Sequence, residues 1–128
     1  MTNDTCEIRF LPGAEKALRK IRKSDPGRLP LIDEVLEDVL VNGWILSVHS
    51  ATIKVLDQQL QIGEIRDLGS GGYRMFFFWH DSSSARTLYI TALEKKSKLA
   101  GKARVNGFID AADALRRRHF GDVEERDQ

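Results

Sequence analysis

The sequence predicts one α+β domain in which a small antiparallel sheet carries two helices on one face. Two observations lead to this expectation. Apolar residues recur at helical spacing early in the chain, and the chain then changes to strand-like segments separated by turns. With 128 residues, 41% of them hydrophobic, the chain is long enough to bury a core in a single domain spanning residues 1–128.

The first part of the chain is expected to form a strand and two helices. Residues 6–11 alternate polar and apolar side chains, as a half-buried strand does, and a Pro-Gly pair ends the alternation. Apolar residues follow at helical spacing in residues 14–21 and again in residues 31–40, with a turn sequence between them. Gly43 is placed to end the second helix with a left-handed cap. We therefore expect two short antiparallel helices after the first strand.

The second part is expected to form a three-stranded meander and a final helix. Residues 52–56 have an extended pattern, and residues 60–68, 73–80 and 86–94 follow as strands joined by short turns. Apolar residues share one helical face over residues 102–119, which predicts a C-terminal helix.

Strand alternation assigns the side chains of residues 73–80 to the two faces of the sheet. The set expected to pack on the helices is Tyr73, Met75, Phe77 and Trp79. The set expected to line the opposite, less covered face is Arg74, Phe76, Phe78 and His80. If Ile65 packs inward on the preceding strand, Arg66 lies beside Arg74.

The net charge of +1 hides an uneven distribution. Residues 121–128 hold four acidic residues and one basic residue, so residues 1–120 carry a charge of +4. Residues 12–23, which include the first helix, are strongly basic. We expect residues 121–128 to form a disordered acidic tail.

Cysteine content and hydropathy indicate a protein of the cytoplasm. Cys6 is the single cysteine, so no internal disulfide can form, and the sequence offers no Cys/His cluster for a metal. No apolar run approaches the roughly 20 residues of a membrane span, and the N-terminus lacks the features of a signal peptide. We therefore expect no metal, no cofactor and no membrane partner.

Four cations are expected to converge on one sheet. Arg66, Arg74 and the pair Lys95/Lys96 come from three successive strands that should lie side by side. Several fixed positive charges on one sheet suit a phosphodiester. The alternative for either arginine is a structural ion pair with Glu64 across the strands.

Three short motifs and the order of the elements resemble those of a known family. The motifs are Glu64-Ile-Arg66, Gly72-Tyr-Arg74 followed by an aromatic strand, and Leu93-Glu-Lys-Lys96. With them, the chain is similar to the RelE/ParE superfamily of toxins from bacterial toxin–antitoxin pairs, and in particular to its HigB-type, phage-derived branch. The resemblance covers most of residues 8–118.

This resemblance implies a function, partners and site residues. The function is that of a ribosome-dependent mRNA endoribonuclease that uses no metal, inhibits translation and growth, and is held inactive by a cognate antitoxin. The expected partners are the ribosome, mRNA and a short helix-turn-helix antitoxin. By motif position, Arg66 and Arg74 would contact the scissile phosphate, with Lys95 and Lys96 close by.

Other side chains are candidates for the same chemistry. Histidine is the side chain that ordinarily changes charge near neutral pH, and His80 shares the Arg74 face, so it is a candidate acid or base. Its alternative is a residue that borders a turn. Lys98 and Lys102 are candidate contacts to ribosomal RNA phosphates. Phe76 and Phe78 either stack on unpaired bases or belong to the core.

Two departures from the family pattern favour a different class of function. No tyrosine follows Tyr89, and Glu64 stands in the region where many members of the superfamily carry paired lysines. The alternative is therefore a toxin-fold binder without nuclease activity, either a ParE-like gyrase inhibitor or a degenerate member that only binds its antitoxin.

Overall fold

The computed structural model describes residues 4–66, 72–96 and 102–120. The elements in this part of the chain are β1 (Cys6–Phe10), α1 (Pro12–Ser24), a 3-10 turn (Pro26–Arg28), α2 (Leu29–His49), β2 (Ile53–Asp57), β3 (Ile62–Arg66), β4 (Tyr73–Asp81), β5 (Arg86–Lys95) and α3 (Lys102–Phe120). Within it, no helix combines the length and the apolar character that crossing a bilayer requires.

The five strands form one mixed sheet in the order β1-β5-β4-β3-β2. Strands β2 to β5 are antiparallel neighbours, which confirms the expected meander and adds β2 at its edge. Strand β1 runs parallel to β5, so the expectation of a purely antiparallel sheet is wrong at this edge. A parallel pair needs a long crossover between its strands, and here the two helices and the rest of the meander separate β1 from β5 along the chain.

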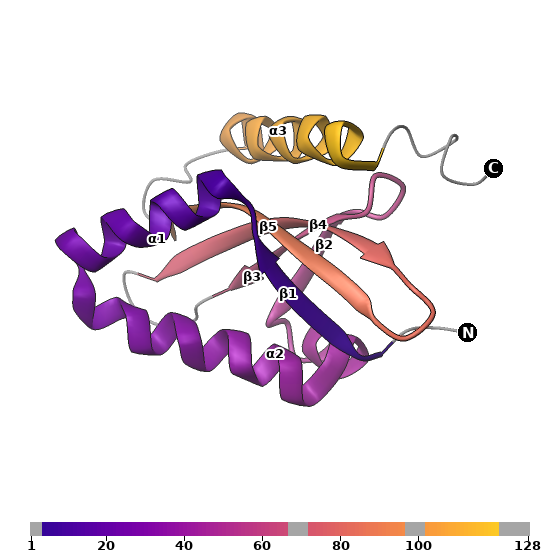
Figure 1. Ribbon diagram of the computed structural model, residues 1–128, viewed down its shortest axis with the longest axis horizontal. Coiled ribbons are helices and arrows are strands. Elements are labelled where there is room, and N and C mark those ends of the chain that lie inside the picture. Colours follow the sequence, from indigo (N-terminus) through magenta and orange to yellow (C-terminus); the bar gives the residue numbers. More distant parts are fainter. Residues whose placement is uncertain (1–3, 67–71, 97–101, 121–128) are drawn as a thin grey trace.

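Helices cover both faces of the sheet, with α2 and α3 on opposite sides (Figure 1). Helices α1 and α2 contribute to one buried cluster, which holds the β4 residues expected to face them: Tyr73, Met75, Phe77 and Trp79. Helix α3 packs on the other face, where Phe108 stacks on Phe76 with ring centroids 4.5 Å apart and Phe120 packs edge-on against Phe78 at 6.1 Å. The expectation of a less covered face is therefore wrong, because α3 removes this second apolar surface from water.

Gly43 interrupts α2 without ending it. Its φ of 83° lies in the left-handed region expected for a cap, but the helix resumes at Trp44. Asp4, which precedes β1, caps this second segment: its backbone oxygen accepts from the Trp44 N–H at 2.7 Å and its carboxylate accepts from the Ile45 N–H at 2.8 Å. The cap comes from 40 residues away in the chain, so local sequence could not predict that the helix continues.

Candidate functional site

Two arginines face each other at one end of the sheet. Arg66 is the last residue of β3, and it lies directly opposite Arg74 near the start of β4. Ile65 is fully buried beneath α2, so the alternation that predicted this pairing is confirmed. Like charges directly opposite each other destabilise a sheet, and the pair therefore needs a counter-ion.

Glu64 is that counter-ion. Its Oε1 accepts a hydrogen bond from Arg66 Nε at 3.2 Å and another from Arg74 Nη1 at 3.0 Å. The Glu64 side chain is 1% exposed, whereas those of Arg66 and Arg74 are 26% and 24% exposed. Its Oε2 has no hydrogen-bond partner among the residues that the structure describes. The structural ion pair is thus confirmed for both arginines.

The ion pairs leave positive charge at the surface. One carboxylate balances only one of two guanidinium groups, and each guanidinium carries five N–H donors, of which Glu64 Oε1 accepts one. Their partial burial and their bonds to Glu64 also restrict both arginine side chains before any ligand binds. This restriction lowers the conformational-entropy cost of binding an anion. We call Arg66 and Arg74 the arginine pair, and Glu64 its counter-ion.

A third guanidinium lies at the same end of the sheet. Glu94 of β5 pairs with Arg74 in the strand register, and its carboxylate accepts a hydrogen bond from Arg104 Nη2 of α3 at 3.3 Å. The Arg104 guanidinium also lies 5.7 Å from the Phe108 ring centroid. Sequence reasoning missed Arg104; its position one helical turn before Phe108, on the face that packs on the sheet, is the signal that could have found it.

The two lysines that close β5 do not join the arginine pair on one face. Lys95 pairs with Tyr73 across the strands and lines a pocket on the α1 side of the sheet. Lys96 directly follows β5 and is exposed, and its backbone N–H donates to the Gly72 carbonyl at 2.9 Å. All four expected cations therefore gather at one sheet end, but Lys95 lies on the opposite face from Arg66 and Arg74.

The remaining lysine candidates are less well placed. Lys98 lies outside the described residues. Lys102 is the first residue of α3, and its side chain is not among those that the structure describes.

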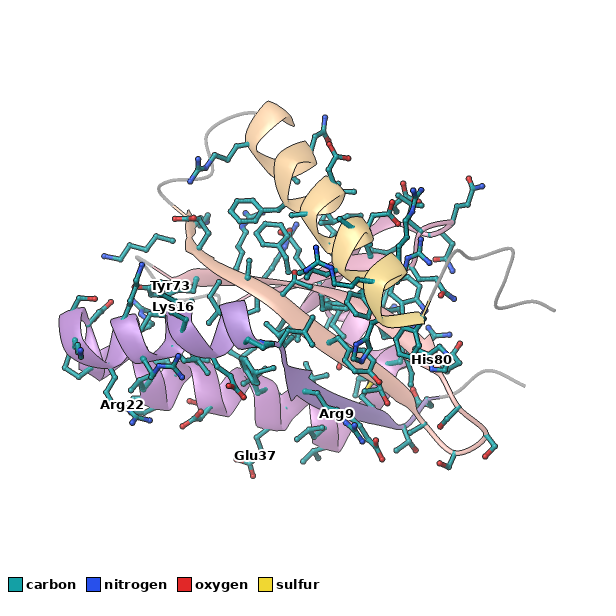
Figure 2. The ribbon with its side chains drawn as sticks, turned by 45° about the horizontal axis from the view of Figure 1, so that its top comes forward. Arg9, Lys16, Arg22, Glu37, Tyr73 and His80 are labelled. Atoms are coloured by element: carbon teal, nitrogen blue, oxygen red, sulfur yellow. The ribbon has the colours of Figure 1, made fainter. Side chains whose placement is uncertain are left out.

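His80 belongs to a different part of the molecule from the arginine pair. It lies at the opposite end of β4 from Tyr73 (Figure 2). It lies six positions along the strand from Arg74, which corresponds to about 20 Å. Its ring stacks on Phe120 with centroids 4.3 Å apart. The prediction that His80 acts as acid or base beside Arg74 is wrong, because alternation specifies a face but not a distance along the strand.

Phe76 and Phe78 are core residues. Both side chains are 0% exposed, Phe76 beneath Phe108 and Phe78 between Tyr89 and Phe120. The alternative in which they stack on RNA bases is wrong for this structure, since α3 occupies the space that a base would need.

Metal and family comparisons give no further assignment. Among residues 4–66, 72–96 and 102–120, no group of three or more His, Cys, Asp or Glu side chains could hold a metal ion. Comparisons of the chain with protein-family models, with curated proteins and with solved structures each found no match. The function of the site therefore has to be argued from its own geometry.

Proposed function

We propose that the protein is a toxin of the RelE/ParE type that cuts ribosome-bound mRNA, with the arginine pair holding the scissile phosphate. The proposal includes a cytoplasmic location and a cognate antitoxin, expected to be a helix-turn-helix protein, that keeps the toxin inactive.

The observation that carries this proposal is the pair of partly exposed guanidinium groups held side by side by one buried carboxylate. Cleavage by 2′-hydroxyl attack builds up negative charge on a pentavalent phosphorane. Guanidinium groups stay charged at any physiological pH and bind phosphate oxygens in a bidentate fashion. Arg104 and the exposed Lys96 add positive potential at the same sheet end.

The expected role of the pair is electrostatic. Glu64 is too deeply buried to reach a 2′-hydroxyl, and His80 is too far away to protonate a leaving group. The Glu94 carboxylate lies opposite Arg74 in the strand register, but it already accepts a hydrogen bond from Arg104. We therefore expect the site to depend on its partner to orient the reacting strand. That dependence agrees with a nuclease that works only when the ribosome presents the mRNA.

A second candidate is a binder of the same fold without nuclease activity. Two observations favour this candidate: His80 lies far from Arg74, and the Glu64 carboxylate neutralises part of the positive charge of the arginine pair. It would arrest growth by engaging another target, such as gyrase, or would only bind its antitoxin.

Induced expression with primer extension on cellular transcripts separates the two candidates. The proposal expects cleavage within translated reading frames and none in naked mRNA. Arg74→Ala should lower the cleavage rate by about 100- to 1,000-fold, the usual loss for one transition-state donor. The matched control is Arg118→Ala, which removes an exposed arginine near the far end of α3 and should leave the rate unchanged. Growth arrest with intact transcripts would reject the nuclease and favour the binder, and DNA-damage signalling would identify gyrase.

A further inference from the structure

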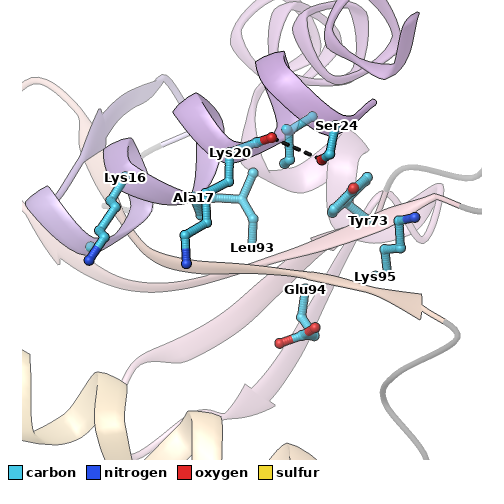
Figure 3. Close-up of a pocket in the computed structure, with 10 residues that line it drawn as sticks. Lys16, Ala17, Lys20, Ser24, Tyr73, Leu93, Glu94 and Lys95 are labelled. Carbon is cyan, nitrogen blue, oxygen red and sulfur yellow. Dashed lines mark hydrogen bonds between the residues drawn. The ribbon is translucent and has the colours of Figure 1, made fainter. Parts of the chain in front are cut away.

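A pocket of about 560 Å³ lies between α1 and the end of β5, on the face opposite the arginine pair. Its polar lining comes from three elements: α1 supplies Lys16, Lys20 and Ser24, β4 supplies Tyr73, and β5 supplies Lys95. Figure 3 shows the Lys16 and Lys20 side chains extending from α1 toward β5. Tyr73 and Lys95 lie on the side of the pocket nearer Ser24. The two α1 lysines are four residues apart, so their side chains emerge on one face of the helix.

The lining of this pocket carries more positive than negative charge. None of the three ammonium groups forms an ion pair with a carboxylate within the described stretches of the chain. Glu94 contributes to the lining, but its carboxylate points away from the α1 lysines (Figure 3) and bonds to Arg104 on the other face. With three lysines and one glutamate, the lining carries a formal net charge of +2.

Two hydroxyl groups complete the lining. Ser24 Oγ donates to the Lys20 carbonyl at 2.9 Å, which leaves its lone pairs and not its proton for a ligand. Burial raises the pKa of the Tyr73 hydroxyl, and nearby Asp25 and Glu94 raise it further against the opposing effect of Arg28. Tyr73 thus keeps its proton at neutral pH and remains a hydrogen-bond donor, which suits an anion.

We propose that this pocket is a second phosphate-binding site, in which Lys16, Lys20 and Lys95 hold the backbone of single-stranded RNA. The identity of the ligand rests on the proposed function. The site itself rests on three ammonium groups that form no ion pair with any carboxylate of the described residues. The α1 lysines lie one helical turn apart, about 6 Å along the axis, so they can engage separate phosphates of one strand. The pocket and the arginine pair flank the same sheet end, and a strand bound at both would wrap around that end.

Binding of an RNA that cannot be cleaved tests the site apart from catalysis. The probe is a fluorescein-labelled, fully 2′-O-methylated oligonucleotide, titrated with the full chain and followed by anisotropy at several salt concentrations. The test variant is Lys16→Gln/Lys20→Gln. The matched control is Arg19→Gln/Lys23→Gln, which removes the same charge at the same spacing from the same helix but outside the pocket lining.

The two variants should behave differently. For the test variant, losing two phosphate contacts should lower the slope of log K against log salt by about 1.4 and weaken binding by about tenfold or more. The control variant should weaken binding by no more than about threefold through general electrostatics and should keep its slope. Lys95→Gln, which acts from a different element, should weaken binding in the same way as the test variant.

Two results would overturn the proposal. One is an equal effect of the test and control pairs, because binding would then follow the overall charge of α1. The other is competition by inorganic phosphate as effective as competition by unlabelled RNA, because a strand engages several ammonium groups at once. A protein that binds RNA through the pocket but never cuts mRNA would refute the proposed function alone.

Discussion

The substitution Glu64→Gln tests whether the arginine pair depends on its buried counter-ion. Glutamine keeps the volume of the side chain and one hydrogen-bond acceptor but removes the charge. Arg66 and Arg74 would then face each other across β3 and β4 without the carboxylate that bonds to both of them. Removing one partner from a buried ion pair typically costs 3–5 kcal/mol. Because both arginines are about a quarter exposed and can turn toward water, we expect a smaller loss, about 2–3 kcal/mol of unfolding free energy.

Urea unfolding followed by circular dichroism measures this loss. With a slope of about 1–3 kcal/mol per M, the midpoint should fall by about 0.7–3 M. Part of the lost unfolding free energy is repulsion between two guanidinium groups. Salt screens this repulsion, because the Debye length falls to about 3 Å at 1 M salt. The difference between the two proteins should therefore shrink at high salt.

A matched control is Glu37→Gln, the same chemical change at an exposed position of α2 (Figure 2). It should alter the free energy by less than about 0.5 kcal/mol. Equal midpoints for Glu64→Gln and the unaltered protein, or a loss that does not respond to salt, would refute the counter-ion role of Glu64.

Three further predictions concern the core. Gly43→Ala should lower the unfolding free energy by about 2–3 kcal/mol, measured by thermal melting, because its φ is 83° and the new Cβ would lie 2.8 Å from the Asp4 carbonyl oxygen. An unchanged Tm would contradict the close approach of Asp4 to this position. Phe108→Ala should lower the free energy of urea unfolding by about 2–3 kcal/mol, because it removes the ring stacked on Phe76. A loss below about 0.5 kcal/mol, roughly that of a surface substitution, would show that this contact does not hold α3 on the sheet. Burial raises the pKa of the Cys6 thiol to about 11, so about one molecule in a thousand is thiolate at pH 8 and alkylation should be far slower than in the urea-unfolded chain; equal rates would contradict its burial. The same shift should lower stability as pH rises from about 9 to 11, because the unfolded thiol loses its proton first.

The sequence by itself determined the type and order of the elements. Helical spacing of apolar residues located α1, α2 and α3, and alternation located the strands and the two faces of β4, because both patterns depend on which side chains share one side of a single element. The same alternation placed Arg66 beside Arg74, since an inward-facing Ile65 puts the next residue on the opposite face of the sheet.

Only the tertiary structure decided which surfaces meet. The sequence carries no local signal that β1 pairs with β5 in parallel, that Asp4 caps the second part of α2, or that α3 covers Phe76 and Phe78. These contacts join residues distant in the chain, and their stability comes from removing apolar surface from water and from pairing buried polar groups. For the same reason the gathering of cations at the sheet end was predictable. Which of them bond to the buried Glu64 on one face, and that Lys95 lines a pocket on the other face, was not.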